Sequence, residues 1–189
     1  ELSLLDDYFT IGINRIFYKY DPTLLIWQDL ALWTQEKEKI LKTSAVKFCR
    51  QGSETRGGFF SFTLDGRDPC LASNLNSLKG RGSSGNIAYQ TAMLLGCNPI
   101  ILVGMDCCYR DIDGKTLTDF YGSNPMHRKH TLINCVKGLE FIQKNTNNRK
   151  VINCSYNNTF KERSSLGEVI DSFCGKKYNR EELQKILVD

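Results

Sequence analysis

Short apolar runs alternate with amphipathic segments along this chain, and that alternation constrains the fold most. The runs are predicted strands at 8–13, 24–27, 45–49, 100–103 and 151–154. Helices are predicted from apolar residues at helical spacing: a brief one at 15–20, then 31–41, 86–95, 130–144, 166–173 and 180–188. Strands that alternate with helices build parallel sheets through right-handed crossovers. The sequence therefore predicts an α/β fold with a doubly wound, mainly parallel sheet.

The composition indicates one globular domain over residues 1–189. Of its 189 residues 41% are hydrophobic and 24% are charged, which excludes a disordered chain and a coiled coil. No apolar run approaches the roughly 20 residues of a membrane-spanning helix. We expect a soluble, cytoplasmic protein, with peripheral attachment to the inner membrane as an alternative. The glycine-rich stretch 50–84 is predicted to be a flexible insertion or lid, with a short strand or hairpin at 59–64.

Charge and cysteine usage narrow the class of protein further. The net charge of +4 is small and dispersed, which argues against nucleic acid as a partner and suits an anionic small molecule. The eight cysteines form no CxxC pair, so we expect reduced thiols rather than a disulfide framework or a zinc site. They are Cys49, Cys70, Cys97, Cys107, Cys108, Cys135, Cys154 and Cys174.

Polar residues follow several of the predicted strands. In doubly wound sheets, ligands bind outside the carboxyl ends of the strands. This rule selects Asn14, Asp29 and Asp106, together with Gln28, Cys154 and Ser155, as candidate site residues. Such residues are also common turn formers, so each of them has a structural interpretation as well. Asp106 in particular could orient a hydroxyl, hold a metal ion or cap the following turn.

A glycine-rich loop, Arg81-Gly82-Ser83-Ser84-Gly85, directly precedes the predicted helix at 86–95. Backbone N–H groups, the positive end of the helix dipole and the arginine would meet there, and this combination suits a phosphate group. The alternative is a flexible linker that ends in a helix cap at Ser84. The loop matches neither GxGxxG nor a Walker motif.

Two further groups could carry chemistry. The acidic turn with Asp111 and Asp113 lacks the remaining ligands of a calcium loop, so a hairpin turn is the preferred interpretation. His127 and His130 lie at the start of a predicted helix without suitable cysteines nearby, so a general base is preferred to a zinc site.

The segment SSGNIAYQTAMLLGCNPIILVGMDCCY at 83–109 resembles the 6-hydroxymethylpterin diphosphokinase-like family, with its GxxPIxLVGxD strand. It is also similar to the bacterial sialyltransferases that build lipooligosaccharide outer cores. These are Rossmann-type glycosyltransferases that use CMP-sialic acid. This second similarity extends over most of residues 8–155 and implies a Rossmann-like fold.

The sialyltransferase resemblance implies roles for several residues. Arg81, Ser84 and Gly85 match the family's R-x-x-S-G, whose arginine and serine help to bind the nucleotide sugar, and Asn14 matches an asparagine that contacts the nucleotide. His130 lies upstream of Gly138-Leu139-Glu140-Phe141-Ile142 and matches the general base of the family. The family's tyrosine two residues after Asp106 is replaced by Cys108, with Tyr109 following.

Both families begin with a G-x-G-P-S-L loop after the first strand, and this sequence contains no such loop. We therefore expect the Rossmann-like sheet to lack its first strand and glycine loop.

The leading hypothesis is a nucleotide-dependent transferase, most like a glycosyltransferase. Its partners would be a nucleotide or nucleotide sugar and an acceptor glycan or small molecule, with no required cofactor. The first alternative is a diphosphokinase-like enzyme acting on a pterin-like substrate, in which Asp29 and Asp106 hold Mg²⁺. The second is a non-catalytic, degenerate nucleotide-binding or structural module.

Overall fold

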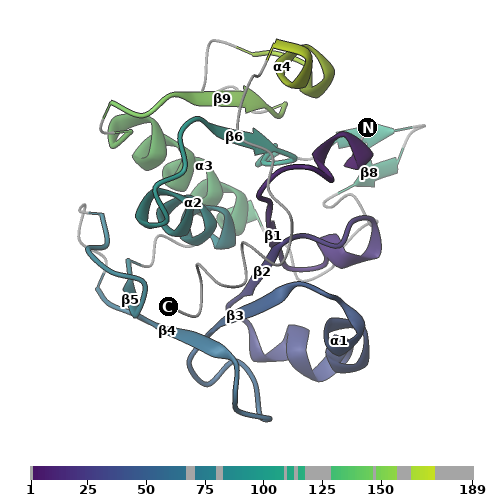
Figure 1. Ribbon diagram of the computed structural model, residues 1–189, viewed down its shortest axis with the longest axis vertical. Helices are drawn as coiled ribbons and strands as arrows, with labels where there is room; N and C mark the ends of the chain where they lie inside the picture. Colours follow the sequence, from purple (N-terminus) through teal and green to yellow (C-terminus); the bar gives the residue numbers. More distant parts are fainter. Residues whose placement is uncertain are drawn as a thin grey trace. The chain divides into compact units, whose positions relative to one another are not determined.

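The computed structural model describes residues 2–66, 71–79, 83–108, 110–112, 115–117, 129–146, 148–156 and 163–172 (Figure 1). They form two compact units. The first contains η1 (Leu2–Leu5), β1 (Ile11–Ile13), η2 (Ile16–Tyr18), β2 (Leu24–Trp27), α1 (Leu30–Lys42), β3 (Val46–Arg50), β4 (Phe60–Leu64), β5 (Ser77–Leu78) and α4 (Leu166–Ser172). The second contains α2 (Ser84–Leu94), β6 (Ile100–Val103), β7 (Arg110–Ile112), β8 (Lys115–Leu117), α3 (Lys129–Lys144) and β9 (Val151–Cys154).

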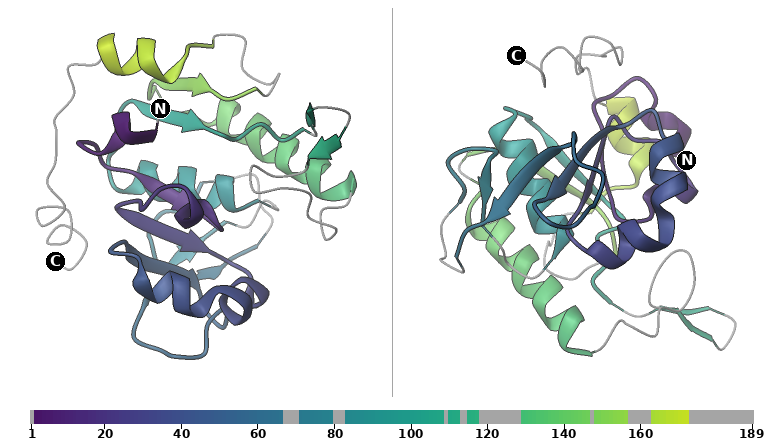
Figure 2. Two further views of the ribbon diagram at one scale, coloured as in Figure 1. Left: turned by 90° about the vertical axis from the view of Figure 1, so that its right-hand side faces the viewer. Right: turned by 90° about the horizontal axis from the view of Figure 1, so that it is seen from below.

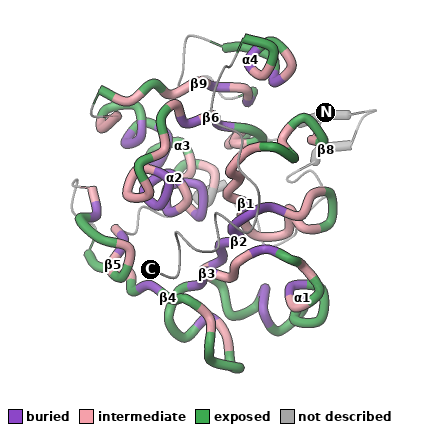
Figure 3. Tube along the Cα trace, viewed as in Figure 1, coloured by how far each residue is buried: buried purple, intermediate pink, exposed green. Residues whose placement is uncertain are grey.

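The first unit is built on a five-stranded parallel sheet in the order β1-β2-β3-β4-β5. β2 pairs in parallel with β1 from Ile11↔Leu24 onward and with β3 from Leu24↔Val46 onward. All four residues of β2 are buried (Figure 3), which is typical of a parallel strand covered on both faces. The predicted α/β class with mainly parallel pairing is therefore confirmed, although the first strand covers only Ile11–Ile13 of the predicted 8–13.

Two tryptophans form the centre of the core between the sheet and α1. The rings of Trp27 and Trp33 are stacked with their centroids 6.1 Å apart, and Phe59 meets both of them edge-on. Each indole N–H has an acceptor 3.0 Å away, the carbonyl of Ser53 for Trp27 and the hydroxyl of Thr55 for Trp33. The aromatic cluster therefore holds α1 against one face of the sheet. Figure 2 shows the sheet and α1 from two further directions.

The segment predicted to be an insertion or lid contributes strands to this sheet. β4 pairs in parallel with β3, and β5 pairs in parallel with β4. Phe62 is 1% exposed, and its ring centroid lies 4.9 Å from that of Phe48 on β3. Burial of this ring adds β4 to the sheet, a long-range effect that the local glycine content does not reveal.

The second unit pairs β6 with β9 in parallel, from Ile100↔Val151 to Val103↔Cys154. α2 packs against α3 and is buried over most of its surface. β7 and β8 are antiparallel, which confirms a hairpin around the acidic turn. Within the described residues β6 pairs only with β9, and Val103 at its end is exposed.

Two predictions about the whole chain stay predictions. The single domain over 1–189 is one of them, and the helix at 180–188 lies outside the described residues. Among the helices that the structure describes, none has the length and apolar character to cross a bilayer.

Candidate functional site

In the second unit, the turn after β6 meets the first turn of α2. Gly104 has a φ of +68°, a conformation that favours glycine, and it turns the chain directly after the strand. A Cβ placed on Gly85 would lie 2.5 Å from Cε of Met105, so the turn touches the helix where Gly85 has no side chain. Two segments that the sequence separates by about twenty residues are thus in direct contact.

The end of β9 joins the same place. The Met105 N–H donates to Oγ of Ser155 at 2.9 Å, and this hydroxyl donates to the Leu102 carbonyl at 3.2 Å. The backbone N–H of Tyr156 donates to Oδ1 of Asp106 at 2.8 Å. Because β6 and β9 are parallel, their carboxyl ends lie together, and these bonds tie the two ends to each other. Asp106 and Ser155, both chosen from the strand-end rule, are therefore neighbours.

The start of α2 contains several polar residues. Ser83 is the N-cap: its Oγ accepts the N–H of Asn86 at 3.2 Å, whereas we predicted Ser84 as the cap. Ser84 and Gly85 are buried in the first turn. Asn86 is 0% exposed, and within the described part of the chain neither Oδ1 nor Nδ2 of its side chain has a hydrogen-bond partner. An unsatisfied buried amide costs about 1–3 kcal/mol, so it calls for an explanation.

Sequence reasoning did not select Asn86. In the sequence, Asn86 is a single amide residue beside Ile87 and Ala88, at the start of a helix predicted from its apolar residues. Met105 and Tyr156 were missed as well, because the contacts that place them join distant parts of the chain.

Asn14 and Asp29 belong to the first unit, where they follow the neighbouring strands β1 and β2. Asn14 has a φ of +51°, and its N–H donates to the Ile26 carbonyl at 3.0 Å. Asparagine tolerates this left-handed conformation better than most residues, which gives Asn14 a structural role in the turn. Asp29 is exposed at the N-cap of α1, and its side chain makes no capping hydrogen bond.

The other predicted site residues can be placed only in part. Arg81 and Tyr109 lie outside the described residues. His130 belongs to the first turn of α3, which confirms its predicted position at a helix start, but its side chain is outside the described part of the structure.

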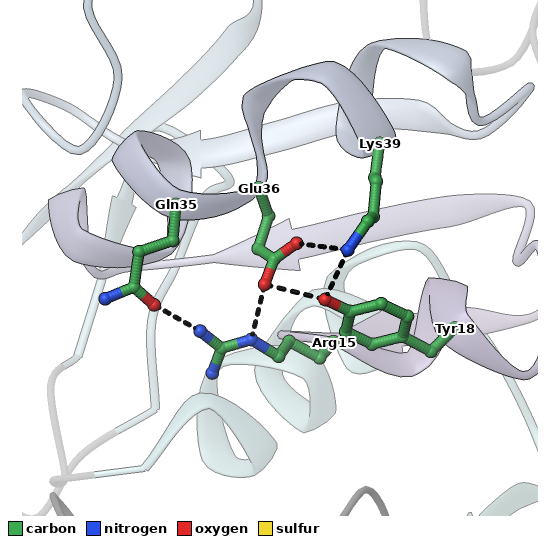
Figure 4. A network of polar contacts seen from close by, with 5 residues as sticks. All are labelled: Arg15, Tyr18, Gln35, Glu36 and Lys39. Carbon is green, nitrogen blue, oxygen red and sulfur yellow. Dashed lines mark hydrogen bonds and ion pairs between the residues drawn. The ribbon is translucent and has the colours of Figure 1, made fainter.

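A separate polar network in the first unit joins η2 to α1 (Figure 4). The Glu36 carboxylate accepts hydrogen bonds from Tyr18 Oη at 2.7 Å, Lys39 Nζ at 3.1 Å and Arg15 Nε at 3.2 Å, and a further arginine N–H donates to Gln35. Burial raises the pKa of Glu36, but the three hydrogen bonds outweigh it and bring the pKa below its ordinary value. The carboxylate is satisfied by its neighbours, so we interpret this network as structural.

Thiols and carboxylates are common metal ligands. Among the residues described, no group of three or more His, Cys, Asp or Glu side chains gathers in a way that could hold a metal ion. The described cysteines form no disulfide; they are Cys49, Cys97, Cys107, Cys108, Cys135 and Cys154. Burial raises the pKa of Cys49 to about 11, so that thiol is chemically inert near neutral pH.

Comparison with known proteins gives no match to a family model, to a curated protein or to a solved structure. The fold and site by themselves define an α/β protein with parallel strands, in which the turn after β6 contacts the start of a buried helix and is hydrogen-bonded to the end of β9.

Proposed function

We propose that this chain is a Rossmann-like, nucleotide-dependent transferase, most like a glycosyltransferase that moves a sugar from a nucleotide sugar to an acceptor hydroxyl. The observation that carries the proposal is the contact between the first turn of α2 and the Gly104–Asp106 turn. A helix N-terminus attracts phosphate, and ligands of parallel α/β sheets bind outside the carboxyl strand ends. Both features occur at one place in the second unit.

The residues of this place supply suitable groups. The helix dipole of the eleven-residue α2 favours an anion at its first turn, where Ser84 and Gly85 lie. The Asn86 amide in the same turn is fully buried and has one donor group and one acceptor without partners among the described residues. In the proposal, Arg81 and Ser84 bind the nucleotide phosphates. Contact of Asn14 with the nucleotide rests on the sialyltransferase resemblance.

His130 is the proposed general base. An imidazole changes charge near neutral pH, so it can take a proton from an acceptor hydroxyl while the nucleotide departs. His130 lies in the first turn of α3. In this proposal sugar transfer requires no metal ion.

Nucleotide binding is the first test. We expect CMP, UDP, GDP, ATP or GTP to raise the melting temperature of the full chain, and Ser84→Ala to reduce that shift. Ser164→Ala, at an exposed serine of the same unit, is the matched control and should keep the full shift. If none of the five nucleotides changes the melting temperature, the transferase proposal fails and a non-catalytic module is favoured.

Turnover is the second test. With sugar donors that carry the nucleotide identified by the first test, His130→Ala should lower sugar transfer by about 100-fold or more while nucleotide binding is unchanged. Transfer should persist in EDTA. A variant with full activity would remove His130 from the mechanism, and activity that vanishes in EDTA would point to the Mg²⁺-dependent, diphosphokinase-like alternative with Asp29 and Asp106.

A further inference from the structure

The side chain of Met105 lies against the first turn of α2, where the proposed function places a phosphate. A Cβ built on Gly85 would have Cε of Met105 at 2.5 Å, Sδ at 3.5 Å and Cγ at 3.9 Å. A glycine lets other groups approach the backbone closely, because it has no side chain. Three consecutive atoms of the Met105 side chain therefore cover the helix backbone at the position where it is most accessible.

The residue that follows Gly85 has polar atoms that a methionine cannot satisfy. Asn86 is 0% exposed, and neither Oδ1 nor Nδ2 has a hydrogen-bond partner among the described residues. Side chains of an α-helix lean toward its N-terminus, so this amide leans over the same first turn. A thioether sulfur is only a weak acceptor, and it carries no N–H or O–H group. The start of α2 therefore combines groups that favour a polar ligand with an apolar cover.

Met105 can leave this position without a change in the backbone. Its N–H donates to Oγ of Ser155, and the carboxylate of Asp106 accepts the N–H of Tyr156, so the main chain of the turn is held in place. The Met105 side chain is only half-buried and has three rotatable bonds. Gly104 beside it is exposed, and no atom lies within 4 Å of a Cβ built on it. Rotation of one side chain is therefore enough to uncover Gly85.

We propose that the side chain of Met105 is a gate over the start of α2, which must turn away from Gly85 before a nucleotide phosphate can reach the first turn. This inference rests on the proposed function, because it requires a nucleotide phosphate at that place. Only the fraction of molecules with the gate open can bind, and the apparent affinity is lowered by that fraction. The gate acts on the phosphate rather than on the base, so every nucleotide that binds is affected by the same factor.

The test is removal of the gate by Met105→Ala. We expect the affinity for nucleotide to rise by about 3- to 10-fold, because a half-buried methionine loses only part of its apolar contacts when it turns away. Isothermal titration of the full chain with CMP, UDP, GDP, ATP and GTP measures this rise, which should be equal for all nucleotides that bind. Met93→Ala is the matched control: Met93 is also half-buried but lies in the last turn of α2, so wild-type affinity is expected.

The titrations distinguish failure of the gate from failure of the transferase proposal. If a nucleotide binds to wild type and binds equally well or more weakly to Met105→Ala, the gate is overturned and the nucleotide site remains. An equal rise in Met93→Ala would also overturn the gate, because it would not be specific to the start of the helix. If none of the five nucleotides binds to wild type, the transferase proposal fails and the gate fails with it.

A second measurement uses the wild-type chain and does not depend on the folding of Met105→Ala. The chain has three methionines, Met93, Met105 and Met126, so isotope-labelled methionine methyl groups give three NMR signals. A saturating nucleotide should move the Met105 signal, which is identified by its loss in Met105→Leu, and should leave the Met93 signal unchanged. A Met105 signal that stays in place while nucleotide is bound would overturn the gate.

Discussion

At the scale of single residues, two buried polar groups differ in whether they have hydrogen-bond partners. Glu36 is buried, and Arg15, Tyr18 and Lys39 satisfy its carboxylate. Asn86 is fully buried and unsatisfied within the described residues. Buried polar groups are normally hydrogen-bonded, so the first is a structural feature and the second indicates a site.

Glu36→Gln should lower the free energy of unfolding by about 1–2 kcal/mol at pH 7, because the charge-assisted bonds are lost. The folded-state pKa of Glu36 is depressed, so its contribution is fully present above the ordinary value of 4.5 and is lost as pH falls below it. Urea unfolding at pH 7 and at pH 3.5 measures this. The difference between variant and wild type should shrink at the lower pH.

Glu38→Gln is the control for this change, since Glu38 is exposed on the same helix. It should leave stability within about 0.5 kcal/mol of wild type at both values of pH. An equal loss in both variants would contradict a specific role for the Glu36 network.

At the scale of elements, local sequence signals indicate where a helix begins and ends, whereas its packing depends on long-range contacts. α2 has its N-cap at Ser83 and ends before Gly96, whose φ of +80° suits a residue just past a helix. The sequence indicated both ends within two residues. The packing of this helix, by contrast, depends on Gly85, where a side chain would collide with Met105.

Ser83→Ala should destabilise the protein by about 1 kcal/mol, because the Asn86 N–H loses its acceptor at the start of α2. Ser83→Asp should remain close to wild type, since aspartate also caps helices and its charge is favourable at that end. Urea unfolding of the three proteins provides the comparison. If Ser83→Ala is as stable as wild type, the cap contributes nothing measurable.

Among the strands, too, some follow from the local sequence pattern and others from long-range contacts. The prediction of β2 and β6 was correct to the residue, because each is a continuous apolar run. A short strand or hairpin was predicted at 59–64 within the insertion, and β4 at Phe60–Leu64 confirms a strand there, but its pairing with β3 and the strand β5 were not predicted. The packing of β1 depends on Gly12, because a Cβ there would lie 2.5 Å from atoms of Ile16 and of Pro22. The sequence pattern did not predict this contact.

At the scale of the whole molecule, the sequence by itself determined the α/β class, the parallel pairing and the positions of most helices and strands. These follow from hydrophobic periodicity, caps and turn residues, which act over a few neighbouring positions. The strand-end rule also selected Asp106 and Ser155, which the structure places side by side.

Only the tertiary structure decided the rest: the contact of Gly85 with Met105, the unsatisfied amide of Asn86 and the place of β4 and β5 in the sheet. Each depends on residues far apart in the chain being brought together or on one being enclosed on all sides. Such proximity is a property of packing, in which many weak contacts act together, and a single sequence carries no local signal for it.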